Sequence, residues 1–164
     1  MSGACFESAK LEKCHLEGVT LTDANFQNAN LINSYWTDSL LPGAIFLNAV
    51  LRGAGLAGIE WEGANLNGAD LRESTFHMGS SRSGLVDSFL ASEGTRTGFY
   101  TDDYEEQYFK SPEEIRKANL RGADLRGANI TGVDFYLVDL RDAQIDDDQR
   151  AQFEKTGAIL FDRD

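Results

Sequence analysis

Cysteine and histidine are scarce in this chain of 164 residues, and each occurs only twice. Two cysteines are too few for the disulfide framework that staples a small secreted domain. Two histidines, His15 and His77, offer little for general acid–base catalysis or a zinc site. The sequence also lacks any stretch near the roughly 18 apolar residues that a membrane-spanning helix needs. We therefore expect neither a disulfide-rich secreted domain nor a protein that crosses a membrane.

Positive charge is in short supply as well. The chain has 15 Lys and Arg residues against 27 Asp and Glu residues, and its formal net charge is −12. This excess argues against direct binding to nucleic acid or to an anionic membrane surface. The N-terminal residues show neither the basic start nor the apolar run of a secretory signal. We therefore expect a cytoplasmic protein that contacts no membrane.

What the sequence does contain is a strict period of five. A large apolar residue recurs at every fifth position from Phe6 to Phe76, and the same interval returns from Leu120 to Ile145. A helix has a period of 3.6 and a strand a period of 2, so neither explains the pattern. The large residues are Phe6, Leu11, Leu16, Leu21, Phe26, Leu31, Trp36, Leu41, Phe46, Leu51, Leu56, Trp61, Leu66, Leu71, Phe76, Leu120, Leu125, Ile130, Phe135, Leu140 and Ile145.

A small residue precedes nearly every large one by two positions, as Ala24 precedes Phe26 and Ala64 precedes Leu66, although Ile59 is large. Residues two apart in a strand point to the same side, so both can face one core. Cys14 takes the small, inward position, whereas Cys5 takes the next one outward. We therefore expect no disulfide between them.

The remaining two positions of each unit must turn a corner. Glycine often stands two residues after the large residue, as at Gly63 and Gly122, where a type II turn needs positive φ. A corner every five residues winds the chain into a coil with its large residues inside. Successive coils then stack about 4.8 Å apart through ladder hydrogen bonds, as in a solenoid.

These units resemble the pentapeptide-repeat family, whose motif is Ala-(Asp/Asn)-Leu-X-X. The likeness is strongest over 64–71 and 118–130 and covers roughly residues 4 to 76 and 118 to 145. The resemblance implies an all-β fold, a right-handed quadrilateral β-helix with four units per coil. Short relatives of this shape are abundant in cyanobacteria.

The chain is expected to form one domain, residues 1–164, with a single interruption. The spacing between Phe76 and Leu120 is not a multiple of five, and two degenerate units fit the second register between 83 and 90. Repeats are therefore predicted over about 4–90 and 118–146, and an inserted loop over about 91–117. The loop is aromatic and acidic. It is either a functional segment or a tolerated bulge that packs on the outside of the coil.

The pattern stops after Ile145. Residues 146–155 indicate a capped helix ended by Gly157. We expect a C-terminal helical cap over about 147–160, with Phe153, Ile159 and Leu160 covering the open last coil. The aspartates at 146–148 are better explained by helix capping than by a calcium site.

Exposed apolar residues give the candidate interaction surface. Outward positions in this repeat are usually polar, but several successive units break that rule around one level of the rod. The inserted loop adds tyrosines. The candidate residues are Ile32, Tyr35, Leu40, Ile45, Leu47 and Val50 in the coil, and Tyr100, Tyr104 and Tyr108 in the loop. The loop folding back over the apolar coil residues is an equally open interpretation.

No nucleophile elbow, phosphate loop or spaced metal-ligand set occurs, so we expect no enzyme, no cofactor and no metal. The favoured hypothesis is a non-enzymatic scaffold that binds an unknown protein, as a monomer or an end-to-end homodimer. The alternative comes from the family resemblance: a DNA mimic that binds or protects a topoisomerase such as gyrase. The net charge fits that alternative, but the acidic residues are not concentrated on the repeats.

Overall fold

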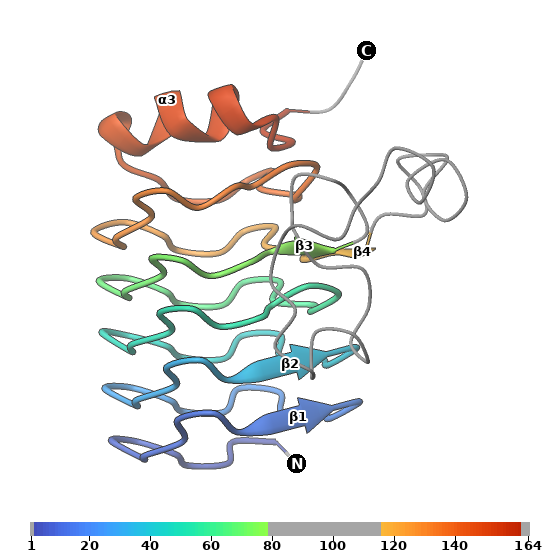
Figure 1. Cartoon of the computed structure of the whole chain (residues 1–164), viewed down its shortest axis with the longest axis vertical. Coiled ribbons are helices and arrows are strands. Elements are labelled where there is room, and N and C mark those ends of the chain that lie inside the picture. Colours follow the sequence, from blue (N-terminus) through green and yellow to red (C-terminus); the bar gives the residue numbers. More distant parts are fainter. Residues whose placement is uncertain (1, 79–115, 162–164) are drawn as a thin grey trace, which may run out of the picture.

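The computed structural model describes residues 2–78 and 116–161. This part of the chain winds into a stack of coils, with a helix across the C-terminal end (Figure 1). Each coil contains 20 residues, because Cys5 bridges Asn25 and Asn25 bridges Ile45 in parallel. Twenty residues are four five-residue units, so a coil has four faces. We number the faces by one bridging residue each: Asn25 on the first, Asn30 on the second, Tyr35 on the third and Leu40 on the fourth.

Backbone hydrogen bonds join each coil to the next. The N–H of Phe6 donates to the carbonyl of Asn25 at 2.7 Å, and the N–H of Asn25 donates back to the carbonyl of Ala4 at 2.8 Å. Most of these contacts are single bridges, since every face is only a few residues wide before the chain turns. The third face is wider, and there β1 (His15–Glu17) pairs in parallel with β2 (Tyr35–Thr37).

The corners follow the predicted turn. At one of them the N–H of Ala64 donates to the carbonyl of Trp61 at 2.9 Å, and the intervening Gly63 has a φ of +67°. The predicted positive φ at the glycines is confirmed. Residues other than glycine also adopt this left-handed backbone conformation, for example Lys13 at a φ of +58°.

The inside of the coils is a continuous apolar core. Leu31, Leu51 and Leu71 lie in one column with 0% exposure, as the period of five predicts. Aromatic rings stack in a second column, where Phe26 and Phe46 have ring centroids 4.8 Å apart. Small residues such as Ala44 fill the alternate inward positions, which keeps the lumen narrow enough for side chains to fill it.

The interruption leaves the stack intact. Glu60 bridges Asn119, a separation of 59 positions instead of 20, so 39 residues are inserted without a change of face. The two ends of the insertion meet at β3 (His77–Met78) and β4 (Arg116–Lys117), which pair antiparallel. The units predicted between 83 and 90, and the predicted loop up to 115, lie outside the described residues.

The C-terminal cap is a ten-residue helix, α3 (Asp147–Thr156), which ends at Gly157 with a φ of +83°. The predicted helix and its glycine stop are confirmed. Beyond it the chain rejoins the coil, because Asp139 bridges Ile159 at the usual interval of 20. The helix therefore takes the place of the second and third faces of the last coil. Ile159 and Leu160, predicted to cover that coil, instead form its fourth face.

Where α3 replaces two faces, no further coil pairs with the backbone carbonyls of the last full coil. Two glutamine side chains of α3 hydrogen-bond to these carbonyls instead. The Nε2 group of Gln149 donates to the carbonyls of Leu125 and Ala128, at 2.8 and 3.0 Å. Gln152 does the same for Ile130 and Val133, at 2.6 and 2.8 Å. No helix within residues 2–78 and 116–161 has the length and apolar character to cross a membrane.

Candidate interaction surface

The six apolar coil residues predicted to form a contact do circle the rod. We call them the apolar belt: Ile32, Tyr35, Leu40, Ile45, Leu47 and Val50. They lie on all four faces, at the level of the second and third coils. Leu40 has 45% exposure, and the others are half-buried. The belt is therefore accessible along most of its course.

Tyr35 is the belt residue with a structural role. Its ring lies over Gly55, directly above it on the third face, where any added Cβ atom would collide with the ring. Below, the ring of His15 meets it edge-on, with centroids 5.3 Å apart. Tyr35 therefore holds two neighbouring coils together on its outer side. The accessible belt is the other five residues, on the first, second and fourth faces.

The third face differs from the others in a way that the sequence analysis did not predict. Thr37, Ala57 and His77 hold outward positions there, yet their exposures are only 2%, 3% and 0%. These three side chains are buried, so they offer no surface to a partner.

The tyrosines predicted as part of the surface, Tyr100, Tyr104 and Tyr108, lie outside the described residues. Their part in an interaction stays a prediction. The structure therefore brings together the coil members of the candidate surface and says nothing on the loop members.

Ion pairs with arginine neutralise some of the carboxylates on the rod. Asp70, Asp124 and Asp139 each pair with the arginine two residues later, at 2.6 to 2.9 Å. Hydrogen bonds from Arg72 and Arg126 lower the pKa values of Asp70 and Asp124. Burial raises the pKa of Asp139, but its hydrogen bonds with Arg141 outweigh this effect and the net shift is downward. All three carboxylates are thus held in the charged form.

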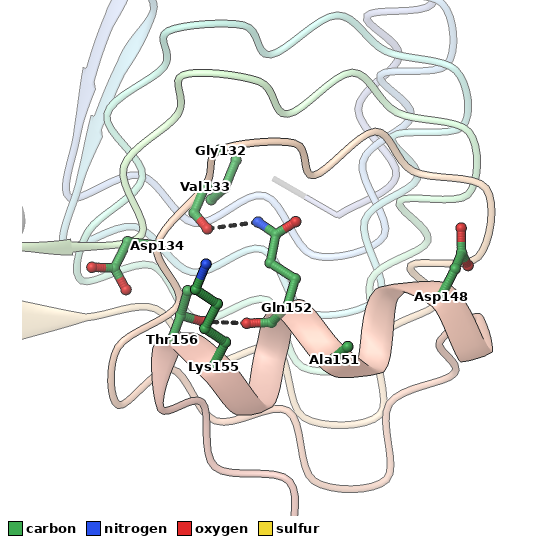
Figure 2. A pocket seen from close by; sticks show the side chains of 8 residues that line it. All are labelled: Gly132, Val133, Asp134, Asp148, Ala151, Gln152, Lys155 and Thr156. Carbon is green, nitrogen blue, oxygen red and sulfur yellow. Dashed lines mark hydrogen bonds between the residues drawn. The ribbon is translucent and has the colours of Figure 1, made fainter.

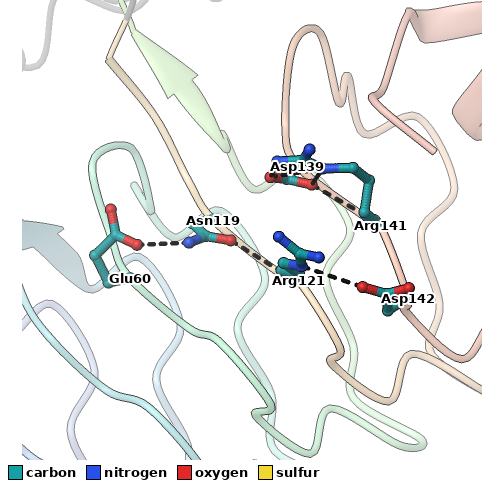
Figure 3. A network of polar contacts seen from close by, with 6 residues as sticks. All are labelled: Glu60, Asn119, Arg121, Asp139, Arg141 and Asp142. Atoms are coloured by element: carbon teal, nitrogen blue, oxygen red, sulfur yellow. Dashed lines mark hydrogen bonds and ion pairs between the residues drawn. The ribbon is translucent and has the colours of Figure 1, made fainter. Parts of the chain in front are cut away.

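A polar network crosses three coils on the fourth face (Figure 3). Asn119 donates to Glu60 of the coil before the insertion at 2.7 Å, and accepts from the backbone N–H of Arg121 at 3.0 Å. Arg121 in turn pairs with Asp142 of the next coil at 3.1 Å. The network joins the coils on either side of the inserted segment. Within it Arg121 neutralises Asp142, whereas Glu60 accepts from the uncharged amide of Asn119.

One pocket of about 550 Å³ lies between α3 and the corner at Gly132. Figure 2 shows its polar lining, with Asp134 and Asp148 at opposite ends and Gln152 between them. The amide nitrogen of Gln152 is already committed to two backbone carbonyls. This pocket brings together no nucleophile and base, and we assign it no chemistry.

The remaining reactive side chains are dispersed. His15 is exposed on the third face, whereas His77 is fully buried, with its Nε2 atom 3.6 Å from a carboxylate oxygen of Asp134. Cys5 is exposed and Cys14 packs against the core, as predicted, and burial raises the pKa of the Cys14 thiol. Among the described residues, no three His, Cys, Asp or Glu side chains converge as metal ligands would.

Comparison with protein families identifies the repeat. A family model described as pentapeptide repeats matches residues 1–38 and 115–145, with eight copies. These two segments of the chain are therefore identified as pentapeptide repeats. No curated protein matches the chain.

Solved structures of pentapeptide-repeat proteins are among those that align with the chain. A protein from the Arabidopsis thaliana thylakoid lumen is 21% identical, with 97% of this chain and 77% of that chain covered and a TM-score of 0.40. Rfr23 from the cyanobacterium Cyanothece 51142 is 18% identical, with coverages of 98% and 90% and a TM-score of 0.37. Trypsin-treated QnrB1, a plasmid-mediated fluoroquinolone resistance protein, is 14% identical, with coverages of 99% and 98% and a TM-score of 0.31. All three TM-scores are low, and the fold described above rests on this chain's own bridges.

Proposed function

We propose that this pentapeptide-repeat protein is a non-enzymatic binding scaffold that docks a protein partner on its apolar belt. The scaffold is the right-handed coil that the family resemblance implies, and its proposed compartment is the cytoplasm. The observation that carries the proposal is the exposure of Leu40, an apolar side chain left 45% open on a face whose neighbouring positions are polar.

The residues of the apolar belt are those of a protein–protein interface, whereas the same columns elsewhere on the rod are polar. In the columns above and below it stand Asn25 and Asn65 on the first face, and Asn30 and Asp70 on the second. The apolar substitutions are thus confined to one level of the rod. Exposed apolar groups gathered in this way, inside a polar rim, are typical of protein interaction sites.

The rim also indicates the kind of partner. Glu60 lies directly above Leu40. Together with the net charge of −12, this carboxylate favours an apolar protein surface that carries basic residues at its edge.

The test is a pull-down from the source organism, followed by binding measurements with the purified partner. The belt variant is Leu40→Ser/Leu47→Ser. The matched control is Gln27→Ser/Asn67→Ser, which changes the two residues below and above Leu47 in the same column. Burying one such apolar side chain contributes about 1.5–3 kcal/mol, so the belt variant is expected to raise the Kd at least about tenfold. A partner that binds wild type and both variants equally well would remove the proposal.

The alternative, a DNA mimic directed at a topoisomerase, needs unpaired negative charge along the rod. Five carboxylates of the described coils are instead paired with arginines, namely Asp70, Glu73, Asp124, Asp139 and Asp142. This pairing weakens the resemblance to a phosphate backbone, and we rank the alternative second. Gyrase supercoiling assays at several salt concentrations test it, because a charge mimic must act more strongly at low salt.

A further inference from the structure

The third face has a column of outward side chains that are buried. Thr37, Ala57 and His77 occupy the position directly after the large residue in three successive coils, and all three are closed to solvent. Neighbours in the same column do not account for this burial, because the equivalent positions on the other faces have such neighbours too and stay half-buried or exposed. In the coil of Ala57 these positions are Pro42, Leu47 and Arg52. The third face is therefore covered from outside the column.

Thr37 gives a second indication of a covering group. Its Oγ1 atom is buried and forms no hydrogen bond with any residue in 2–78 or 116–161. Buried hydroxyl groups normally have a hydrogen-bond partner, so the covering group should bring a donor or an acceptor. The structure contains a single chain, so the atoms that exclude solvent from Thr37 and Ala57 belong to this chain and not to a second molecule.

The inserted segment leaves and re-enters the coil on this same face. Residues 79–115 are flanked by β3 and β4, whose pairing holds the two ends of the segment side by side. His77 lies one coil above Ala57 and two coils above Thr37. Two coils are about 10 Å at the usual strand spacing. An extended chain covers about 3.3 Å per residue, so a few residues of the segment are enough to reach Thr37.

We propose that residues 79–115 dock on the third face and cover Thr37 and Ala57. Because the segment is tethered at both ends beside this face, its effective concentration there is high. The chemistry of the two surfaces also matches, since the segment has apolar and aromatic residues over 85–90 and 99–109. The outward positions that it covers are uncharged, namely Tyr35, Thr37, Gly55, Ala57 and Thr75.

This docking leaves the apolar belt open on the first, second and fourth faces. The inference therefore concerns a different side of the rod from the proposed function and does not depend on it.

NMR of the full wild-type chain with labelled alanine and leucine methyl groups tests the proposal directly. The Ala57 methyl group is expected to show cross-peaks with protons of residues 79–115. The control is Leu47, which holds the equivalent position on the first face of the same coil, and its methyl groups are expected to show none. Cross-peaks of Ala57 confined to residues 2–78 and 116–161 would overturn the proposal, as would equal contacts of the segment with both residues.

Thiol reactivity measures the same contact by a different route. In a chain with Cys5→Ser/Cys14→Ala, the single thiol of Ala57→Cys is expected to react slowly with a maleimide. Replacing residues 79–115 by a Gly/Ser segment of equal length removes the docking side chains and keeps the tether. The reaction rate is then expected to rise at least about tenfold.

The matched control is Gln27→Cys, at the equivalent position on the first face, whose rate should change by less than about twofold on the same replacement. Circular dichroism verifies that every variant is folded. An unchanged rate for Ala57→Cys would show that the coil alone buries this position, and the proposal would be wrong.

Discussion

The rings of Phe26 and Phe46 stack nearly parallel, with centroids 4.8 Å apart and an interplanar angle of 5°. Twenty residues separate them in sequence, which is one coil of the solenoid. The centroid distance equals the spacing of neighbouring strands, so side-chain stacking and backbone pairing follow the same repeat. The core is thus a set of columns, and each column is continuous only while every coil contributes a side chain.

Phe46 tests how far one coil supports the next. Its ring also stacks on Trp61 at 4.8 Å, and its replacement opens a gap in the middle of the column. We expect Phe46→Ala to lower the free energy of unfolding by about 3–5 kcal/mol, measured by urea denaturation. Leu40→Ala, a truncation on the exposed belt, is the control and should cost under about 1 kcal/mol. Similar losses in both variants would contradict a dry, continuous core.

Gln149 tests the replacement of two coil sides by α3. Its side chain makes three hydrogen bonds, to the carbonyls of Leu125 and Ala128 and from the N–H of Asp146. At about 1 kcal/mol for each bond, Gln149→Ala should destabilise the protein by about 2–3 kcal/mol. Glu154→Ala, on the exposed side of the same helix, should change stability by under about 0.5 kcal/mol. Equal melting temperatures for the two variants would mean that the helix does not replace the ladder.

Gly63 tests the corner geometry without a packing contribution. It has a φ of +67°, and a Cβ atom at this position would meet nothing within 4 Å. Gly63→Ala should therefore cost about 1–2 kcal/mol through backbone strain alone. Gly63→Asn should cost less, because asparagine tolerates the left-handed region and already occupies corners such as Asn28 and Asn48. The two substitutions are compared by thermal denaturation, and an alanine variant as stable as wild type would refute the strain argument.

The pH dependence of stability in an Arg126 variant tests whether the ion pair between Arg126 and Asp124 stabilises the fold. Its hydrogen bonds lower the pKa of Asp124, so the pair stabilises the fold above the unfolded carboxyl pKa of about 3.9. That contribution is lost as the pH falls through the lower, folded value. We expect Arg126→Met to be slightly less stable than wild type at pH 7, since water screens the half-exposed Arg126, and to lose less stability than wild type on acidification.

The matched control for this pH series is Arg150→Met, because Arg150 is exposed on α3 and forms no ion pair with a described residue. Its stability difference from wild type should stay constant between pH 7 and pH 3. An Arg126→Met profile that runs parallel to wild type would show that the pair does not stabilise the folded state.

The sequence was sufficient for the coil because its information is local and repeated. Every unit states which residue points inward and where the corner lies, and columns such as Leu31, Leu51 and Leu71 follow from stacking alone. The cap was predictable as a helix from its acids and its final glycine. Its exact role was not, because the match between Gln149 and two carbonyls is made across 21 to 24 residues.

The candidate surface was predictable only as a set of outward apolar positions. The period of five assigns Leu40 and Tyr35 to equivalent outward positions. In the structure Leu40 is exposed, whereas the ring of Tyr35 covers Gly55. The difference depends on what stands one coil above, and a large side chain over glycine is a contact between distant positions. The burial of Ala57 and His77 on the third face is likewise a tertiary effect that no single unit reveals.

The most direct test of the account is the NMR contact pattern of the leucine column, in protein with labelled methyl groups. Leu31, Leu51 and Leu71 should show methyl–methyl cross-peaks between successive members, which are twenty positions apart in sequence. Methyl contacts restricted to near neighbours in sequence, with none at an interval of twenty, would contradict the stacked coil and everything inferred from its surfaces.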